Sequence, residues 1–133
     1  VKLKEAGALK VIELNVSGAF HSPLMSTAVQ KMTKFIEDAP VTVPDCPVIT
    51  NVDAMPTTEP QEFKRKLLEQ INHSVLWYPT VQALFNSGVQ SFIEIGSGRV
   101  LSTIVKKLDR KRNVYNTDDF EQIEKELSTL KAN

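Results

Sequence analysis

Strand-like and helix-like segments alternate in the second half of the chain, and this alternation constrains the fold most. Residues 90–95 (QSFIEI) have the composition of a short strand, and residues 99–108 (RVLSTIVKKL) have apolar side chains at helical spacing. The Gly-Ser-Gly sequence between them predicts a tight turn, and residues 113–117 (NVYNT) predict another strand. A helix that connects two neighbouring strands makes them parallel, so this stretch predicts a parallel α/β unit.

The first half of the chain predicts more helices and fewer strands. Residues 1–7 predict the end of a helix that Gly7 stops, and residues 10–16 (KVIELNV) predict a strand with one exposed face. An amphipathic helix is predicted over 23–39, and a short buried strand lies within the proline-rich segment that follows (PVITNV). Further helices are predicted for residues 58–71, 79–86 and 120–130, the first with Thr58 and Gln61 at capping-box spacing. We therefore expect an α/β fold with a mostly parallel sheet and flanking helices.

Charge and composition exclude several classes of protein. The 16 basic and 16 acidic residues cancel, so no overall field attracts nucleic acid or an anionic membrane. No apolar run approaches the roughly 20 residues that a membrane-spanning helix needs. We expect neither a nucleic-acid nor a membrane partner. The single Cys46 cannot form an internal disulfide, which suits a reducing compartment, and we expect the cytoplasm. No metal site is predicted, because Cys46, His21 and His73 do not have ligand spacing.

One histidine lies where ligands collect in α/β folds. His21 follows a predicted strand and precedes a predicted helix, and the carboxyl ends of strands are the common ligand sites of open α/β sheets. A histidine there can act as a general base near neutral pH. The alternative is a loop histidine that packs or caps, and the residues of this segment alone favour it. Ser22 is expected to cap the helix that begins at Pro23 rather than to act as a nucleophile.

Two further features have a functional and a structural interpretation. The strand, glycine turn and helix of IEIGSGRVL could aim backbone N–H groups at an anion, but the spacing matches no phosphate-binding fingerprint. A structural turn that requires glycine is the alternative. The basic clusters Lys64–Lys66 and Lys106–Arg112 predict solvated faces, or a docking patch for an acidic partner.

Three segments occur in the order and approximate spacing of one enzyme family: VSGAFHSPLM, PVITNVDA and LLEQINHSVLWYPTVQALFNSGVQSFIEIGSGRVLSTIVKK. From about Lys4 to Lys107 the chain resembles the C-terminal portion of the malonyl-CoA:acyl carrier protein transacylases. The resemblance implies transfer of a malonyl group from coenzyme A to acyl carrier protein in fatty acid synthesis, by a Ser-His ping-pong mechanism. It implies no cofactor, only malonyl-CoA and the phosphopantetheine of the carrier protein as substrates.

The resemblance also implies roles for five residues. His21 matches the catalytic histidine, and Gln70 matches the position whose backbone carbonyl orients it. A carbonyl that accepts from Nδ1–H leaves Nε2 as the base, and the Gln70 side chain is not expected to matter. Phe20 matches a bulky aromatic residue that disfavours a methylmalonyl group, and Asn51 matches an asparagine beside the substrate cleft. Lys10 falls near a basic position that meets the carrier protein.

The family fold is a hydrolase-like α/β subdomain with a small ferredoxin-like insertion. Residues 1–15 would be the last helix and strand of the insertion, and residues 16–133 the C-terminal part of the large subdomain. The chain contains no G-H-S-x-G motif, so the nucleophilic serine is expected in a preceding N-terminal part. The arginine that pairs with the malonyl carboxylate and the oxyanion-hole donors are expected there too. We expect the full-length parent to be a monomer and these residues alone to be inactive.

Two alternatives remain open at this point. The chain could be part of an acyltransferase domain of a polyketide synthase, which uses the same chemistry. It could also be a non-catalytic module that binds carrier protein, with His21 and Gln70 as remnants of an enzyme. A G-H-S-x-G motif upstream would support an enzyme.

Overall fold

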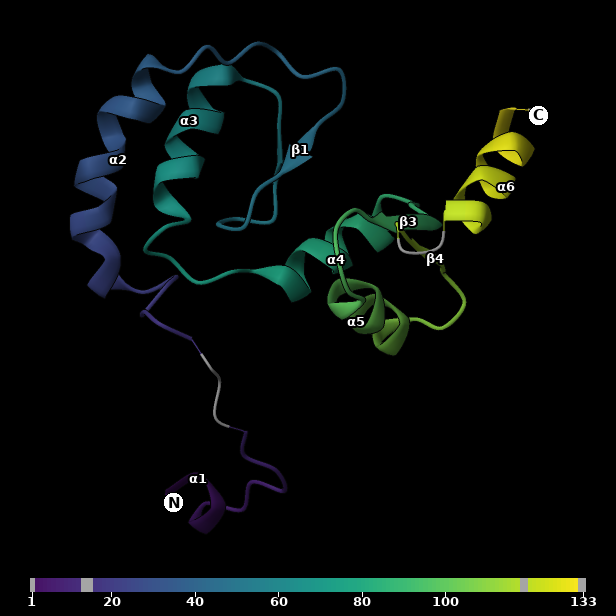
Figure 1. The fold of residues 1–133 in the computed structure, drawn as a ribbon, viewed down its shortest axis with the longest axis horizontal. Coiled ribbons are helices and arrows are strands. Elements are labelled where there is room, and N and C mark those ends of the chain that lie inside the picture. Colours follow the sequence, from purple (N-terminus) through teal and green to yellow (C-terminus); the bar gives the residue numbers. More distant parts are fainter. Residues whose placement is uncertain (1, 13–15, 118–119, 132–133) are drawn as a thin grey trace. The chain divides into compact units, whose positions relative to one another are not determined.

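The computed structural model describes residues 2–12, 16–117 and 120–131 (Figure 1). The chain forms two compact units. Unit 1 comprises Val1–Val52 and Pro56–Val75, and unit 2 comprises Asp53–Met55 and Leu76–Asn133.

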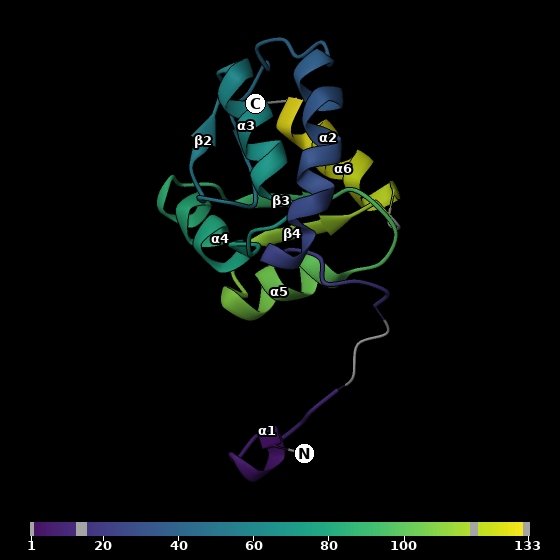
Figure 2. The same cartoon turned by 90° about the vertical axis from the view of Figure 1, so that its left-hand side faces the viewer.

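Helices dominate unit 1. The chain begins with the short helix α1 (Lys2–Glu5), and Gly7 follows with a positive φ of 91°, as predicted for a residue that stops a helix. A 3₁₀ turn (Pro23–Met25) leads into α2 (Ser26–Asp38), which confirms the helix predicted for this segment. The next helix, α3 (Pro60–Glu69), lies beside α2 (Figures 1 and 2). Proline at its first position suits a helix start, because its missing N–H would have no intrahelical partner there.

The strands of unit 1 are short. Val48–Ile49 (β1) pairs antiparallel with Pro56–Thr57 (β2), which places a strand within the predicted PVITNV segment. The strand predicted over 10–16 is not formed by residues 10–12 and 16, and residues 13–15 lie outside the described residues. A strand is stable only when a partner backbone accepts its hydrogen bonds, and no described residue pairs with residues 10–12.

Unit 2 contains the predicted parallel α/β unit. Ser91–Glu94 (β3) and Asn113–Asn116 (β4) run parallel, in a register that pairs Ser91 with Asn113, and α5 (Val100–Leu108) connects them. Two more helices, α4 (Trp77–Asn86) and α6 (Phe120–Lys131), belong to this unit. The described strands thus form two sheets of two strands each, and the α/β content that the pattern predicted is confirmed.

The two units differ in what they bury. In unit 2, Val81 of α4 and Val105 of α5 are almost fully buried. In unit 1, the buried residues are the polar Thr50, Thr57 and Lys66, and none of its described apolar residues is buried. Among the described helices of both units, none combines the length and the apolar character needed to cross a membrane.

Candidate functional site

His21 is held by two consecutive carbonyl groups just after α3. Its backbone N–H donates to the carbonyl oxygen of Ile71 at 3.2 Å, and its Nδ1 lies 2.7 Å from the carbonyl oxygen of Gln70. The φ angle of His21 is +59°, a left-handed conformation that few residues other than glycine adopt. These bonds join residues 49 and 50 positions apart, so the placement of the imidazole is a tertiary feature.

The Gln70 carbonyl determines which imidazole nitrogen is available for chemistry. A carbonyl oxygen has no hydrogen to donate, so Nδ1 must carry the hydrogen in this bond. In the neutral imidazole, Nε2 then has a lone pair. None of the described residues forms a hydrogen bond with this Nε2. The arrangement can therefore accept a proton at Nε2 while Nδ1 stays bound.

The carbonyl that holds His21 is available because α3 ends there. Gln70 is the C-cap of α3, with φ −62° and ψ −19°, and its own N–H donates to the carbonyl of Lys66 at 3.0 Å. The last carbonyls of a helix have no intrahelical partner, so that of Gln70 can accept from the imidazole. This end of a helix also has a partial negative charge, which favours a positive charge beside it.

Asn51 contacts Gln70 through its side chain. The amide Nδ2 of Asn51 donates to Gln70 Oε1 at 3.2 Å, and both residues are half-buried. Gln70 is thus bound at two points, at its backbone carbonyl by His21 and at its side chain by Asn51. The sequence did not indicate this link, because the family resemblance implies a role for the Gln70 backbone alone. A contact between Asn51 and substrate stays a prediction.

The remaining two predicted site residues lie on exposed segments. The Phe20 side chain is 60% exposed, and a Cβ atom added to Gly18 would lie 3.2 Å from the Phe20 ring. Gly18 therefore leaves room for the ring beside the backbone. Lys10 is exposed, in the segment between α1 and the His21 turn. The roles of Phe20 in selectivity and of Lys10 in carrier binding stay predictions.

Ser22 and His73 also bond to carbonyl groups near His21. Ser22 is the N-cap residue of the 3₁₀ turn, as expected, but its hydroxyl donates to the carbonyl of Ala19 at 2.7 Å and makes no cap bond. The Nδ1 of His73 lies 2.8 Å from the Glu69 carbonyl, four residues back along the chain. Since both histidines of the chain contact carbonyls at one helix end, a bond of this kind is not by itself a sign of catalysis.

Backbone N–H groups at the start of α5 bind a carboxylate of the chain itself. Gly96 and Gly98 have φ angles of 141° and 86°, so the turn requires glycine. The Glu94 carboxylate accepts from the Ser102 hydroxyl at 2.6 Å and from the backbone N–H groups of Ser102 and Leu101 at 2.9 and 3.0 Å. These bonds, chiefly those of Ser102, lower the pKa of Glu94 to about 2. The Glu94 carboxylate therefore occupies these two N–H groups, and binding of an external anion at the turn stays a prediction.

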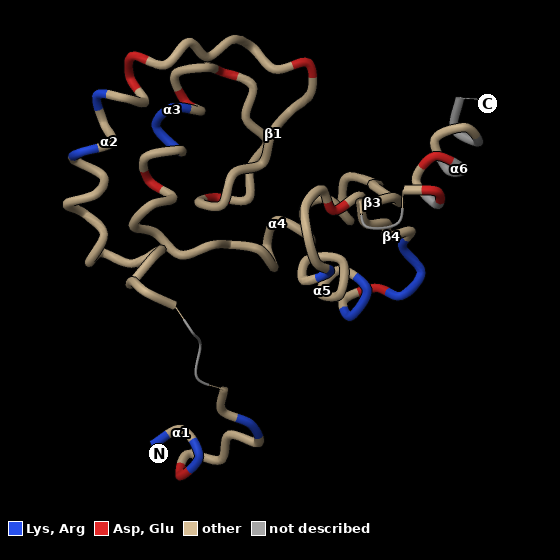
Figure 3. The backbone as a smooth tube through the Cα atoms, in the orientation of Figure 1, with Lys and Arg blue, Asp and Glu red and all other residues tan. Residues whose placement is uncertain are grey.

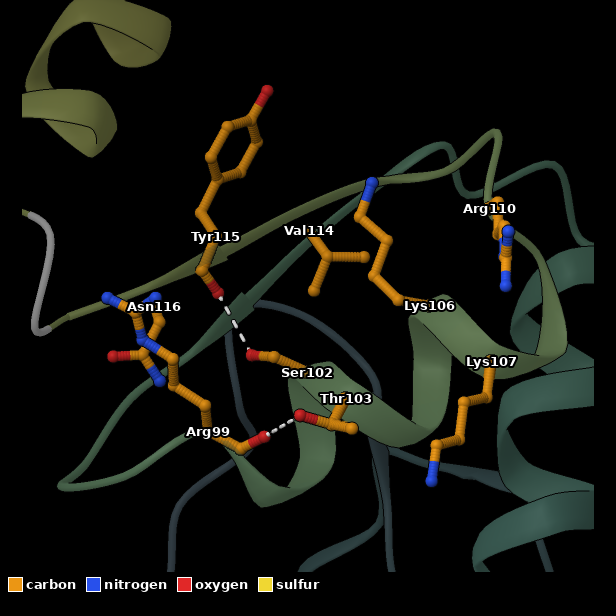
Figure 4. A pocket seen from close by; sticks show the side chains of 9 residues that line it. All are labelled: Arg99, Ser102, Thr103, Lys106, Lys107, Arg110, Val114, Tyr115 and Asn116. Atoms are coloured by element: carbon orange, nitrogen blue, oxygen red, sulfur yellow. Dashed lines mark hydrogen bonds between the residues drawn. The ribbon is translucent and has the colours of Figure 1, made fainter.

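Unit 2 has a concave region of its own. Its volume is about 540 Å³, and α5 and β4 form its walls. Lys and Arg residues gather along the end of α5 and the segment after it (Figure 3). The cationic side chains that line the region (Arg99, Lys106, Lys107 and Arg110) point in different directions (Figure 4). They do not converge on one ligand position, and none of the five predicted site residues lines this region.

The side chains of the other basic cluster, Lys64–Lys66, bond to groups within unit 1. The Lys64 ammonium donates to the carbonyl of Glu37 at 2.6 Å, and Arg65 pairs with Glu62 and Glu69. Lys66 is 3% exposed, and its Nζ lies 2.6 Å from the hydroxyl of Thr57, so it is not on a solvated face. Among the described residues, no three His, Cys, Asp or Glu side chains come together in a way that could hold a metal ion.

Comparison with known proteins identifies the family. No sequence-family model matches the chain. The malonyl CoA-acyl carrier protein transacylase of Bacillus subtilis is 42% identical over 128 residues, which cover 96% of this chain and 40% of that protein. The chain belongs to the malonyl-CoA:acyl carrier protein transacylase family. The resemblance of its motifs to this family is confirmed.

Other transacylase relatives agree with this assignment. A crystal structure of the acyl-carrier-protein S-malonyltransferase from Bartonella henselae superposes with a TM-score of 0.88 at 31% identity, covering 96% of this chain and 40% of that one. The polyketide biosynthesis transacylase PksC of Bacillus subtilis is 41% identical over 101 residues, 75% of this chain and 34% of that protein. The chain therefore spans about 40% or less of the length of these transacylases.

Proposed function

We propose that this chain is the C-terminal part of an enzyme that transfers a malonyl group from coenzyme A to acyl carrier protein. The observation that carries the proposal is the bond between the Nδ1 of His21 and the Gln70 carbonyl at 2.7 Å, within a chain of this family. It fixes an imidazole whose Nε2 is available as a base, which is the group that acyl transfer through a serine requires.

The reaction takes place in two acyl transfers. In the first, the serine hydroxyl gives its proton to Nε2 of His21 and attacks the malonyl thioester, and the imidazolium protonates the departing coenzyme A thiolate. In the second, Nε2 accepts the proton of the pantetheine thiol, whose sulfur attacks the malonyl-serine ester. The same proton returns to the serine oxygen. The Gln70 carbonyl binds Nδ1–H throughout and stabilises each imidazolium.

The serine of this mechanism is proposed to lie in the part of the transacylase that this chain does not span, because no G-H-S-x-G motif occurs in these 133 residues. We assign residues 16–133 to a hydrolase-like large subdomain and residues 1–15 to a ferredoxin-like small one. The exposed apolar side chains of Leu24 (82%) and Phe35 (71%) suit an interface with that remaining part. The complete enzyme is proposed to be a cytoplasmic monomer.

Two residues are proposed to act on the substrates. The exposed ring of Phe20, next to the base, would crowd a methyl group on the α-carbon of the acyl chain and so favour malonyl over methylmalonyl. The exposed ammonium of Lys10 would attract the acidic carrier protein, mainly through the rate of association.

The test is malonyl transfer by the complete protein that contains this chain and the G-H-S-x-G serine. We expect His21→Ala to lower kcat about 10²- to 10⁴-fold, the usual contribution of a general base. The matched control is His73→Ala, which removes an exposed imidazole bound to the neighbouring carbonyl and should leave kcat close to wild type. Equal activities of the two variants would reject His21 as the base. Carrier binding without transfer by the wild type would indicate a binding module instead.

The identity with PksC favours a second candidate, malonyl transfer to the carrier protein of a polyketide pathway. The chemistry at His21 would be the same, and only the acceptor would differ. Assays of the complete protein with carrier proteins of both kinds distinguish the candidates. A higher kcat/KM with the fatty-acid carrier supports the first, and a higher value with the polyketide carrier supports the second.

A further inference from the structure

We propose that Asn51 is a positioning residue, which holds the peptide group that orients His21 by binding the Gln70 side chain. The inference rests on the proposed function in that His21 is the base. It changes the expected roles of two residues. Asn51 acts through Gln70 rather than on the substrate, and the Gln70 side chain has a role beside that of its backbone.

The geometry forms a continuous chain of two hydrogen bonds. Asn51 Nδ2 donates to Gln70 Oε1 at 3.2 Å, and the Gln70 carbonyl accepts from His21 Nδ1 at 2.7 Å. Asn51 follows strand β1 and is 19 residues from Gln70, so this is a tertiary contact rather than a helix cap. The base and Asn51 thus bind the same residue from two sides.

The position of Gln70 explains why a second anchor is needed. Gln70 is the C-cap of α3, so its carbonyl accepts no hydrogen bond within the helix, and only the turn bonds of residues 71–73 follow it. Helix ends fray. The direction of the Gln70 carbonyl depends on its ψ angle. A bond between its side chain and a separate segment holds the Gln70 Cα, from which the carbonyl extends, and so helps to keep the carbonyl directed at the imidazole.

Kinetics of the complete protein separate positioning from substrate binding. We expect Asn51→Ala to lower kcat about three- to tenfold, the effect of one hydrogen bond, with no change in the KM for malonyl-CoA. Gln70→Met keeps the backbone carbonyl and the side-chain length but removes the acceptor, and it should cause a similar loss. Because both changes break the same bond, the double variant should be no slower than either single variant.

The matched control is Asn72→Ala. Asn72 is also half-buried. Its amide nitrogen donates to the Ser26 hydroxyl at 3.3 Å and its amide oxygen lies 2.8 Å from Nδ1 of His73, and neither bond involves Gln70 or His21. This variant should retain the wild-type kcat. A rise in KM with an unchanged kcat for Asn51→Ala would overturn the inference in favour of a substrate contact. Fully multiplicative losses in the double variant would overturn it as well.

A spectroscopic readout separates failure of this inference from failure of the proposed function. Nitrogen-15 NMR of the neutral imidazole distinguishes a protonated Nδ1 from a protonated Nε2. Asn51→Ala should raise the share of the His21 tautomer with hydrogen on Nε2, and Asn72→Ala should not. If the wild type transfers no malonyl group, the proposed function fails. The tautomer shares would still show whether Asn51 positions His21 through Gln70. Identical tautomer shares in wild type and Asn51→Ala would refute the positioning role.

Discussion

The carboxyl end of α3 and the amino end of α5 each bind a titratable side chain from outside the helix. They differ in how many atoms of that side chain they bind. At α3, the Gln70 carbonyl binds only Nδ1 of His21. At α5, both oxygens of Glu94 accept hydrogen bonds, from Leu101 and Ser102. A positive charge suits the first helix end and a negative charge suits the second.

The difference separates a side chain that can react from one that stabilises the fold. The Glu94 carboxylate has a pKa of about 2, well below its usual range, because its bonds favour the charged form, so it does not exchange protons near neutral pH. The imidazole of His21 keeps one nitrogen without a partner among the described residues. The packing around the two helix ends differs in the same way. The α5 region has a buried apolar core, whereas the α3 region buries only polar residues.

Removing the carboxylate at α5 should have the largest effect on stability. Glu94→Ala leaves the N–H groups of Leu101 and Ser102 without their acceptor, so unit 2 should unfold at a clearly lower urea concentration than in the wild type. Glu94→Gln should fall between the two, since its amide oxygen still accepts. The only tryptophan, Trp77, lies in unit 2, so its fluorescence reports the transition. A Glu94→Ala midpoint equal to that of the wild type would mean that the cap does not stabilise the unit.

The same carboxylate predicts a pH dependence of stability. The pKa of Glu94 is about 2 in the folded protein and near its ordinary 4.5 when unfolded. Its contribution is therefore complete above about pH 4.5 and is lost as the pH falls towards 2. Urea midpoints of wild type and Glu94→Gln, followed by Trp77 fluorescence, should differ at neutral pH and converge in acid. A constant difference down to pH 2 would contradict the assignment.

A smaller loss is expected when one donor of the cap is removed. Ser102→Ala deletes the hydroxyl that lies 2.6 Å from Glu94 but keeps the backbone N–H, and should cost about 1 kcal/mol. Thr103→Ala is the control, because its hydroxyl bonds only to the Arg99 carbonyl on the preceding turn, 2.5 Å away. Urea unfolding of the two variants gives the comparison. If Thr103→Ala lowered the free energy of unfolding as much as Ser102→Ala, the bond between Ser102 and Glu94 would have no particular importance for stability.

An effect of similar size is expected from the backbone at His21. Its φ of +59° is unfavourable for any residue with a Cβ atom, whereas glycine adopts it freely. His21→Gly and His21→Ala both lack the imidazole, so their difference isolates the backbone. The glycine variant should be more stable by about 1 kcal/mol, measured by urea unfolding followed by circular dichroism. A more stable alanine variant would show that this φ angle is not maintained.

Local sequence patterns predicted the elements of the fold whose partners are near in sequence. The β3–α5–β4 unit followed from apolar spacing and the glycine turn, and α2 followed from the apolar positions after Pro23. The strand predicted over 10–16 depended on a partner strand that the described residues do not provide. The start of α3 was also misplaced, because Glu59 rather than Thr58 is its N-cap.

The candidate site was less accessible from local pattern. The spacing of His21 and Gln70 carries no signal across 49 residues, and family resemblance brought them together. The burial of Lys66 and the bond between Asn51 and Gln70 were missed. Both depend on side-chain contacts between separate segments of the chain, which periodicity does not encode. A half-buried asparagine next to a short strand has no distinguishing sequence pattern.

The central claim is that the Gln70 carbonyl selects the reactive nitrogen of His21. The most direct measurement is nitrogen-15 NMR of the neutral His21 imidazole in the wild-type protein, in alkaline buffer, with His21→Ala used to assign its signals. We expect Nδ1 to carry the hydrogen and Nε2 to have none. A His21 imidazole protonated mainly at Nε2 would contradict it.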